Sequence, residues 1–457
     1  MRKLFLFGLL QALLLLAGCG GSSGGGVVTS TTGNSSGTGG SHPANTVTMT
    51  VDSGPNGNDV DTPFITVTLC APGSTTNCQQ IDHVEVDTGS YGFRVMSSVL
   101  SPALASALQQ EQVTANGDSV VECTQFADGF SWGPVKIADV QVAGESASRV
   151  PIQVMGDPAY AATSGTTSEI PTACSSVGPE EDTVATFGAN AIIGIGPFGA
   201  DCGSACDAAV GSPTNPGWYY GCPASGWTPS NPCSEIALAD TGQVTNPVVF
   251  FQTDYNGVIV EFPQATEGAS TLTGTLVFGI GTQSNNSLGA QTVLTADSSY
   301  GDVNTSYTPL SGSQQYLPYS FFDTGSNAYY FYDDGIQSYT SCSSYKGYDS
   351  TTPASWFCPA SELNRNALNT GQNGTQSTVY FSVGNAYTLF NTYSGWVFTD
   401  LGASAGTMPS ACSSAATASQ DTSCGFDYGF PFFIGRNVYI AYAGANTAWG
   451  TGPYYGY

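Results

Sequence analysis

The residues of this chain best suited to chemistry are two aspartates in a repeated tetrapeptide. Asp87-Thr88-Gly89-Ser90 recurs in the second half of the chain as Asp323-Thr324-Gly325-Ser326. Two carboxylates held close together cannot both ionise cheaply, so they share one proton. The ionised partner can act as a general base on water, and the protonated partner as a general acid. The alternative is a pair of strand-end turns in which aspartate only caps the backbone.

Each tetrapeptide is followed by a second feature of one kind. Ile192-Ile193-Gly194 lies downstream of the first copy, and Phe433-Ile434-Gly435 lies downstream of the second. Two features that recur in the same order indicate two related lobes. We therefore expect an N-terminal β lobe over residues 46–265 and a C-terminal β lobe over residues 266–457.

The body of the chain reads as short strands separated by turns. Its runs are rich in β-branched and aromatic residues, which predicts an all-β protein. The clearest runs are Val47–Val51, Phe64–Leu69, Val135–Val142, Val248–Phe251, Val258–Phe262, Thr275–Ile280 and Val438–Tyr442. The best candidate helix is Ser101–Gln110, which has Pro102 in its first turn.

Together, the tetrapeptides and the segments after them resemble the pepsin-like (A1-type) aspartic proteases over residues 47–457. Each lobe of that family has a hydrophobic-Asp-Thr/Ser-Gly-Ser/Thr loop, braced by two hydrophobic residues and a glycine. The resemblance implies an all-β, bilobal architecture with the active-site cleft between two β lobes. It also implies an aspartic endopeptidase that cleaves peptide or protein substrates at acidic pH, without a cofactor or a metal, with Asp87 and Asp323 as its catalytic dyad.

The resemblance also implies roles for the residues around the dyad. The threonine hydroxyls cross-link the two loops, the glycines allow tight turns, and the serines hydrogen-bond the outer carboxylate oxygens. These supporting residues are Thr88, Gly89, Ser90, Thr324, Gly325 and Ser326.

Three departures from the family pattern concern the surroundings of the dyad. The expected flap hairpin corresponds to residues 125–130, with Phe126 where tyrosine is usual, followed by Gly129. Trp132 is the nearby substitute hydrogen-bond donor, and Arg94 stands where the family often has tryptophan. No basic prosegment is visible in residues 20–45. These departures leave open a second hypothesis, a non-proteolytic protein of the same fold that binds peptides or proteins in its cleft, although such a protein would be free to lose one aspartate and this chain keeps both. A lipid-anchored β-sandwich or surface-structure protein is a third.

The chain is strongly acidic, with eight Lys and Arg against thirty-four Asp and Glu and a net charge of −26. Such a surface repels nucleic acid and anionic membranes. We expect a monomer with no nucleic-acid partner.

Thirteen cysteines are present, and twelve remain when Cys19 is set aside. In an oxidising compartment these could form up to six disulfides, although the sequence does not fix their pairing. The close pairs Cys70/Cys78, Cys202/Cys206, Cys222/Cys233, Cys342/Cys358 and Cys412/Cys424 suggest local loops, and Cys123 and Cys174 would then pair by elimination. Zinc is disfavoured, because the chain has no CxxC pair and only two histidines.

Three weaker motifs have simpler interpretations. The glycine pattern of residues 194–199 is typical of dinucleotide sites, but Pro197 opposes the helix that such a site needs. For His83, the simpler interpretation is a side chain on the surface of a strand, and the alternative is a catalytic base. The acidic loop of residues 52–61 could bind calcium, and a solvated turn is the simpler interpretation.

The first residues indicate export. Arg2 and Lys3 precede an apolar run, Leu4–Leu16, and small residues lead to Cys19. This predicts a lipoprotein signal peptide over residues 1–18 and a lipidated Cys19 at the start of a Gly/Ser/Thr-rich tether, residues 19–45. An ordinary signal peptide is the alternative. The only membrane contact we expect is this lipid anchor, placed in the bacterial outer membrane.

The lipid anchor can be tested directly. Cys19→Ser should move the protein from the membrane fraction to the soluble fraction, because the thiol that carries the lipid is lost. Immunoblotting of fractionated cells measures this, with Cys70→Ser as the control for loss of a thiol elsewhere. Unchanged membrane association of the Cys19 variant would contradict the lipoprotein hypothesis.

Overall fold

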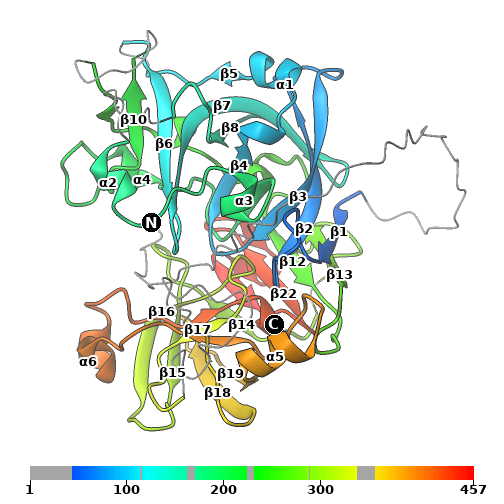
Figure 1. Ribbon diagram of the computed structural model, residues 1–457, viewed down its shortest axis with the longest axis vertical. Coiled ribbons are helices and arrows are strands. Elements are labelled where there is room, and N and C mark those ends of the chain that lie inside the picture. Colours follow the sequence, from blue (N-terminus) through cyan, green and yellow to red (C-terminus); the bar gives the residue numbers. More distant parts are fainter. Residues whose placement is uncertain (1–43, 114–115, 162–169, 224–230, 288, 337–355) are drawn as a thin grey trace, which may run out of the picture.

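A computed structural model describes residues 44–113, 116–161, 170–223, 231–287, 289–336 and 356–457 (Figure 1). The predicted signal peptide, Cys19, nearly all of the tether and Cys342 lie outside the described residues. Within the described residues, no helix is long and apolar enough to span a membrane.

Strands dominate the first half of the described chain. They are β1 (Thr46–Val51), β2 (Pro63–Cys70), β3 (Cys78–Asp87), β4 (Tyr91–Met96), β5 (Gln109–Gln110), β6 (Ser119–Gln125), β7 (Phe130–Val142), β8 (Glu145–Met155), β9 (Ala191–Ile195), β10 (Tyr219–Cys222), β11 (Ser234–Glu235) and β12 (Gly257–Glu261). The α-helices here are short: α1 (Pro102–Ala107), α2 (Thr172–Ser175), α3 (Val184–Phe187) and α4 (Ser204–Asp207). Three 3₁₀ helices complete this half: η1 (Ser97–Val99), η2 (Asp240–Gly242) and η3 (Pro247–Phe250).

The second half has the same character. Its strands are β13 (Leu272–Phe278), β14 (Val293–Thr295), β15 (Val303–Tyr307), β16 (Gln315–Phe322), β17 (Tyr329–Phe331), β18 (Leu363–Thr370), β19 (Gln376–Val383), β20 (Gly402–Ser404), β21 (Asp427–Tyr428), β22 (Asn437–Ala441), β23 (Asn446–Thr447), β24 (Gly450–Thr451) and β25 (Tyr454–Gly456). The helices are α5 (Ala386–Thr392), α6 (Ala415–Ala418), η5 (Ser410–Ser413) and η6 (Phe430–Phe432).

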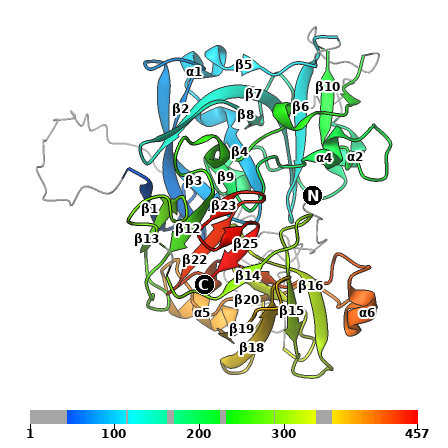
Figure 2. The ribbon, with the colours of Figure 1, turned by 180° about the vertical axis from the view of Figure 1, so that it is seen from behind.

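The strands form two lobes, seen as the upper and lower halves of Figure 1. The larger sheet runs in the order β11-β10-β6-β7-β8-β4-β9-β3-β2-β1-β13-β12-β22-β25-β14, and a seven-stranded sheet runs β19-β18-β15-β16-β21-β17-β20. Strands β1, β13, β12, β22 and β25 lie between the lobes in the view from behind (Figure 2). The all-β, bilobal architecture implied by the resemblance is therefore confirmed, and the two lobes share a central sheet.

The period-two pattern predicts most strands, with one error. The composition of residues 248–251 predicts a strand, but they form part of the 3₁₀ helix η3 and the residue that caps it. Pro247 fixes the backbone at the first helical position, and the Asn246 side chain accepts the N–H of Val248. The predicted helix is real but shorter, since α1 starts after the capping Ser101 and ends at Ala107.

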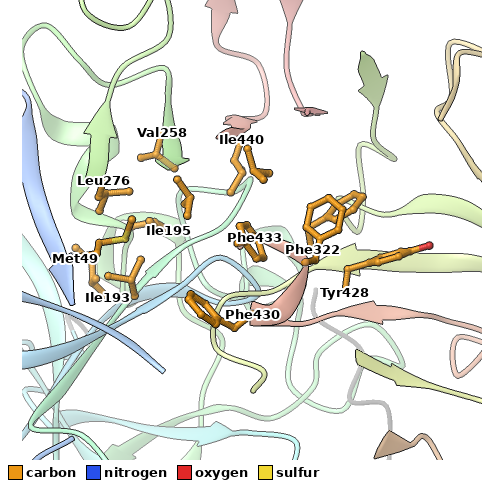
Figure 3. Close-up of a cluster of buried hydrophobic side chains, with 14 of the residues drawn as sticks. Met49, Ile193, Ile195, Val258, Leu276, Phe322, Tyr428, Phe430, Phe433 and Ile440 are labelled. Atoms are coloured by element: carbon orange, nitrogen blue, oxygen red, sulfur yellow. The ribbon is translucent and has the colours of Figure 1, made fainter. Parts of the chain in front are cut away.

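One hydrophobic cluster continues from the first lobe into the second. Its buried side chains come from the strands of the shared sheet and from segments next to both Asp-Thr-Gly-Ser tetrapeptides (Figure 3). They include Met49, Ile193, Ile195, Val258, Leu276, Phe322, Tyr428, Phe430, Phe433 and Ile440. Each lobe covers part of the apolar surface of the other. Burial of this surface therefore stabilises the two lobes together.

Five of the predicted cysteine pairs are present. They are Cys70–Cys78, Cys123–Cys174, Cys202–Cys206, Cys222–Cys233 and Cys412–Cys424. Cys342 of the sixth predicted pair is outside the described residues. Disulfide bonding is thus confirmed for these ten cysteines, which fits an oxidising compartment.

Three carboxyl groups meet where the lobes are joined. Asp61, in the first lobe, donates its N–H to the Trp396 carbonyl at 2.9 Å and accepts the Phe398 N–H at 2.8 Å. Glu267 accepts two hydrogen bonds from Thr399, in the same loop of the second lobe. One oxygen each of Asp61, Glu267 and Asp400 is buried and accepts no hydrogen bond from any residue that the structure describes.

These carboxyl groups favour protonation in the folded state. Burial raises the pKa of Asp61 well above its ordinary range, and the charges of Glu267 and Asp400 raise it further, against a lowering by the Phe398 N–H. Burial, with Glu267 and Glu362 nearby, raises the pKa of Asp400 from 3.8 to about 7. Between the ordinary pKa of Asp400 and its raised value, the folded state binds more protons than the unfolded state. The free energy of unfolding therefore falls as the pH rises through this range.

We predict that the free energy of unfolding decreases from pH 4.5 to pH 7.5, with Asp400 contributing up to about 3 kcal/mol of the decrease. Asp400→Asn removes the titrating group and should flatten this dependence. Urea unfolding at both pH values measures it, with Asp207→Asn as a control because Asp207 is exposed on α4. An unchanged pH dependence in Asp400→Asn would contradict this assignment.

Candidate active site

The two tetrapeptides form equivalent turns between strands. The first follows Val86 at the end of β3 and leads into β4, while the second follows Phe322 at the end of β16 and precedes β17. In the first lobe, β9 lies between β3 and β4, with Ile193 opposite Val86 on one side and Phe93 on the other. The predicted brace Ile192-Ile193-Gly194 therefore supports the first turn directly.

The brace of the second turn differs from the predicted segment. Strand β21 lies between β16 and β17, with Tyr428 opposite both Phe322 and Tyr329. The brace is therefore Asp427-Tyr428-Gly429, whereas Phe433-Ile434-Gly435 follows η6 and bonds to the strand connection at Pro263. The hydrophobic-hydrophobic-glycine pattern misses it because Asp427 occupies a position expected to be apolar.

The distance along the sequence between the two glycines could have identified the correct brace. Gly194 and Gly429 are 235 residues apart, close to the 236 residues between Asp87 and Asp323. Both glycines are required by close backbone approach. A Cβ on Gly194 would lie 2.5 Å from the Tyr91 nitrogen, and one on Gly429 would lie 1.9 Å from the Ala328 carbonyl oxygen.

The two threonines bind each other's loop reciprocally. Thr88 donates its N–H to Thr324 Oγ1 at 3.1 Å, and Thr324 donates its N–H to Thr88 Oγ1 at 3.0 Å. Each hydroxyl in turn donates across the interface, Thr88 to the Phe322 carbonyl at 2.8 Å and Thr324 to the Val86 carbonyl at 2.5 Å. Both threonines are fully buried, so the exchange holds the two loops in a fixed relative position.

Each aspartate is held by its own turn in the same way. Asp87 Oδ1 accepts the N–H groups of Gly89 and Ser90 at 2.6 and 3.1 Å, and the Ser90 hydroxyl donates to its Oδ2. Asp323 Oδ1 accepts the Gly325 N–H at 2.8 Å, and Asp323 Oδ2 accepts the Ser326 hydroxyl at 3.0 Å. Charge-assisted hydrogen bonds of this kind fix the orientation of both carboxyl groups.

The two carboxyl groups lie across from each other. A Cβ on Gly89 would lie 2.4 Å from Asp323 Cγ, and a Cβ on Gly325 would lie 2.8 Å from Asp87 Cγ. The position of the Gly325 Cβ is 2.8 Å from Asp87 Oδ1 and 3.2 Å from Asp323 Oδ1. The two Oδ1 atoms are therefore within the roughly 6 Å over which neighbouring charges alter each other's ionisation.

A third carboxyl group extends the dyad. The Ser326 hydroxyl contacts both Asp323 Oδ2 and Asp427 Oδ2, the latter at 2.7 Å. Asp427 is 4% exposed, and Asp87 and Asp323 are 3% and 2% exposed. Since one hydroxyl donates a single proton, Ser326 can serve both carboxyl groups at once only if one of them is protonated.

The surroundings of the dyad are acidic. Glu85 precedes Asp87 by two residues on β3, so the alternation of the strand directs both side chains to the same face. Burial raises the pKa of Glu85 well above its ordinary range, and the charges of Asp87, Asp323, Asp59 and Asp128 raise it further. Glu85 therefore favours its neutral form beside the two aspartates.

The predicted flap is a hairpin of β6 and β7, closed by a hydrogen bond from the Phe126 N–H to the Gly129 carbonyl. Phe126 packs on Phe187 at 5.4 Å within the first lobe, and Trp132 is buried and donates its indole N–H to the Tyr160 carbonyl. The indole N–H is thus already used. At the turn, Asp128 acts electrostatically on Glu85, as the dyad does.

Arg94 connects the strand after the first turn to this hairpin. Its guanidinium is buried and bonds to Glu122 at 2.7 Å, Asp201 at 3.0 Å and Thr124 at 2.8 Å. Glu122 and Thr124 are on β6, so these contacts bind the hairpin to β4. A buried arginine is tolerated here because its charge is paired and its donors are satisfied.

The weaker motifs have structural explanations. No helix opens at residues 194–199, where a Cβ on Gly196 would lie 2.7 Å from the Thr88 carbonyl oxygen. His83 is part-exposed on β3 and contacts Asp82 at 3.1 Å and Asp52 at 3.6 Å. Within the described residues, no three His, Cys, Asp or Glu side chains are grouped to hold a metal ion.

Comparisons with known proteins give a family without an assigned function. A family model described as "Protein of unknown function (DUF3443)" matches residues 41–457. No curated protein matches the chain. Among solved structures, the crystal structure of the aspartic proteinase from Irpex lacteus is similar, with 15% identity and a TM-score of 0.45. That match covers 90% of this chain and 96% of the other.

Gly89 tests how closely the two loops approach. Gly89→Ala should destabilise the fold by about 1–3 kcal/mol, because the added methyl group overlaps the Asp323 carboxyl group. Gly199→Ala is the matched control, since its Cβ would meet only Val249 at an ordinary 3.6 Å. Urea unfolding compares the two variants, and equal stabilities would contradict the close approach.

Proposed function

The chain belongs to the family of unknown function DUF3443, and we propose that it is an aspartic endopeptidase. In this proposal Asp87 and Asp323 are the catalytic dyad, and the substrate is a peptide or protein. One observation carries the proposal: each tetrapeptide places its glycine against the carboxyl group of the other, while the threonines exchange hydrogen bonds. A pair of capping turns has no need for this reciprocity.

The chemistry follows from the two inner oxygens. In this proposal the inner oxygens are the two Oδ1 atoms, which lie within the roughly 6 Å over which charges interact, while the Oδ2 atoms accept serine hydroxyls. A water molecule held by both Oδ1 atoms loses a proton to the ionised carboxylate as it attacks the substrate carbonyl carbon. The protonated carboxyl group gives its proton to the carbonyl oxygen, which forms a gem-diol. When the C–N bond breaks, the leaving nitrogen takes the proton that the first carboxyl group received from water, and a gem-diol hydroxyl returns a proton to the second. Aspartic proteases work in this way, with two carboxyl groups that share one proton.

The acidic surroundings support a low working pH. The pKa of Glu85 is raised well above its ordinary range by burial and by the dyad itself. At acidic pH Glu85 is neutral, so it adds no negative charge beside the dyad. As the pH rises, ionisation of Glu85 adds a like charge, and the dyad loses the proton it needs.

Export fits the same proposal. The five disulfides favour an oxidising compartment, and we propose that Cys19 carries the lipid that anchors a monomeric enzyme to the outer membrane. The substrate would then be a peptide or protein outside the cytoplasm.

The hairpin favours a second candidate, a binding protein that does not cleave. Phe126 packs within its own lobe and the Trp132 N–H is already bonded, so neither is available to hold a substrate by a hydrogen bond. The same cleft could bind a peptide without hydrolysing it.

Substitution of the dyad separates the two candidates. Asp87→Asn and Asp323→Asn should each abolish cleavage of a denatured protein mixture between about pH 3 and 7, the range in which such dyads work. Asparagine is nearly isosteric but can be neither the base nor the partner that shares the proton. The two losses should not add, because the residues act as one unit.

Asp207→Asn serves as the control, and pepstatin-type inhibition should abolish the activity of the native protein. Circular dichroism establishes that the variants fold. Cleavage that survives in both dyad variants would show that another group is responsible. Absence of cleavage by the native protein at every pH tested would favour the binding protein.

A further inference from the structure

Positive side chains are scarce in this chain, yet two of them line one cavity. Of the eight Lys and Arg, five lie in the described residues: Arg94, Lys136, Arg149, Arg365 and Arg436. Arg365 and Arg436 both line a cavity of about 430 Å³ between the β18–β19 hairpin and residues 431–436. In a protein of net charge −26, this concentration of positive charge needs a reason.

Arg436 has no carboxylate partner within the described part of the chain, whereas Arg94 and Arg365 do. Its guanidinium donates to the Phe432 carbonyl and lies over the Phe432 ring, 4.6 Å from the centroid. Tyr329 lines the same cavity, and burial raises the pKa of its hydroxyl while the Arg436 charge lowers it by a smaller amount. A guanidinium has five N–H donors, so several remain for a group that enters the cavity.

Arg365 adds positive charge to the cavity, but some of its N–H donors already bond to other groups of the protein. It donates to the Tyr307 hydroxyl at 3.0 Å and to the Thr308 carbonyl, and its distance to the buried Asp333 carboxylate is 3.5 Å. The pair with Asp333 holds the Arg365 side chain in place at the wall of the cavity. Arg436 is therefore the residue that would bind an anion directly. Arg365 would add to the positive electrostatic potential of the cavity.

The rest of the lining is neutral and partly aromatic. Asn364, Gln264 and Ser382 offer hydrogen-bond donors, and the Tyr380 side chain is at the rim. Tyr380 is 73% exposed, the highest value among the large hydrophobic residues on the described surface. An exposed ring beside a cation is suited to a ligand that has an apolar face and an anionic group.

We propose that this cavity binds a carboxylate ligand with a flat apolar body. The carboxylate pairs with the Arg436 guanidinium, which matches its planar geometry, and the apolar body covers Tyr380. The volume is in the range of small-molecule sites, roughly 300–1,000 Å³. The site is separate from the dyad, because neither tetrapeptide contributes to its lining. The proposal therefore stands whether or not the protein is a protease.

The cavity lies next to the connection between the two lobes. The Arg436 carbonyl accepts the Phe262 N–H at 3.1 Å, and Gly435 donates its N–H to the Pro263 carbonyl. Phe262 and Pro263 follow β12 at the connection between the lobes, and Gln264 of that connection lines the cavity. A ligand in this cavity would contact both the connection and the second lobe.

The test uses calorimetric titration of the full exported chain at pH 7. Three probes are used. Benzoate represents a small aromatic acid, and a tripeptide that ends in phenylalanine with a free C-terminus represents a peptide carboxylate. The C-terminal amide of the same tripeptide lacks the carboxylate. We expect benzoate or the free-acid peptide to bind and the amide to bind at least about tenfold more weakly, the value of one charge-assisted hydrogen bond.

Arg436→Gln should weaken binding by about tenfold or more, and Arg436→Lys by less, since lysine keeps the charge but loses the planar fork. Tyr380→Ala should weaken the binding of benzoate more than that of acetate, an additional probe that has the carboxylate but no ring. Arg149→Gln is the control, because Arg149 is an exposed cation outside the cavity.

Circular dichroism confirms folding, and Tyr380→Ala remains informative if Arg436→Gln does not fold. Equal binding by the native protein and folded Arg436→Gln would overturn the proposal. So would the absence of binding by every probe at about 10 mM, a concentration far above the Kd of a specific site.

Discussion

The fold of this protein depends on the reciprocal hydrogen bonds between Thr88 and Thr324. Each threonine receives an N–H from the other loop and donates its hydroxyl to a carbonyl there. Because both residues are buried, removing one would leave polar groups unsatisfied in both lobes at the same time. The lobes are therefore fixed relative to each other at the same point where the two carboxyl groups meet, and the precision of the site is a consequence of the lobe contact.

This contact is supported from behind by the shared sheet and the hydrophobic cluster. Strand β1 pairs with β13 over six residues, so the start of the described chain is hydrogen-bonded to the second half. Phe322, which directly precedes Asp323, packs on Tyr428 of the brace at 4.9 Å. An error in the relative position of the lobes would thus disrupt backbone pairing and aromatic packing together. These coupled constraints hold the two carboxyl groups in one fixed relative geometry.

Local patterns predict the fold class, most strands and the repeat that marks the site. They fail where the structure depends on contacts distant in sequence. The second brace is misassigned because Asp427 is polar, and the Ser326 hydroxyl that bonds to it comes from a turn 101 residues earlier in the chain. The run at residues 248–251 has a strand composition, but the local bond from Val248 to the Asn246 side chain favours a 3₁₀ turn. Arg94 can be recognised as unusual, but its partners Glu122 and Asp201 become neighbours only in the folded chain.

The distribution of charge gives the structure a consistent physical character. Burial raises the pKa of carboxyl groups throughout the molecule: Asp59, Asp61, Glu85, Glu111, Glu145, Glu180, Glu181, Asp201, Glu261, Glu267 and Asp400. Few cations are present to compensate them, so at neutral pH each such group opposes folding, whereas at acidic pH it is a neutral hydrogen-bonding group. Because the raised pKa of each group makes its ionisation unfavourable in the folded state, these carboxyl groups together stabilise the fold at acidic pH and withdraw that stability as the pH rises to neutrality.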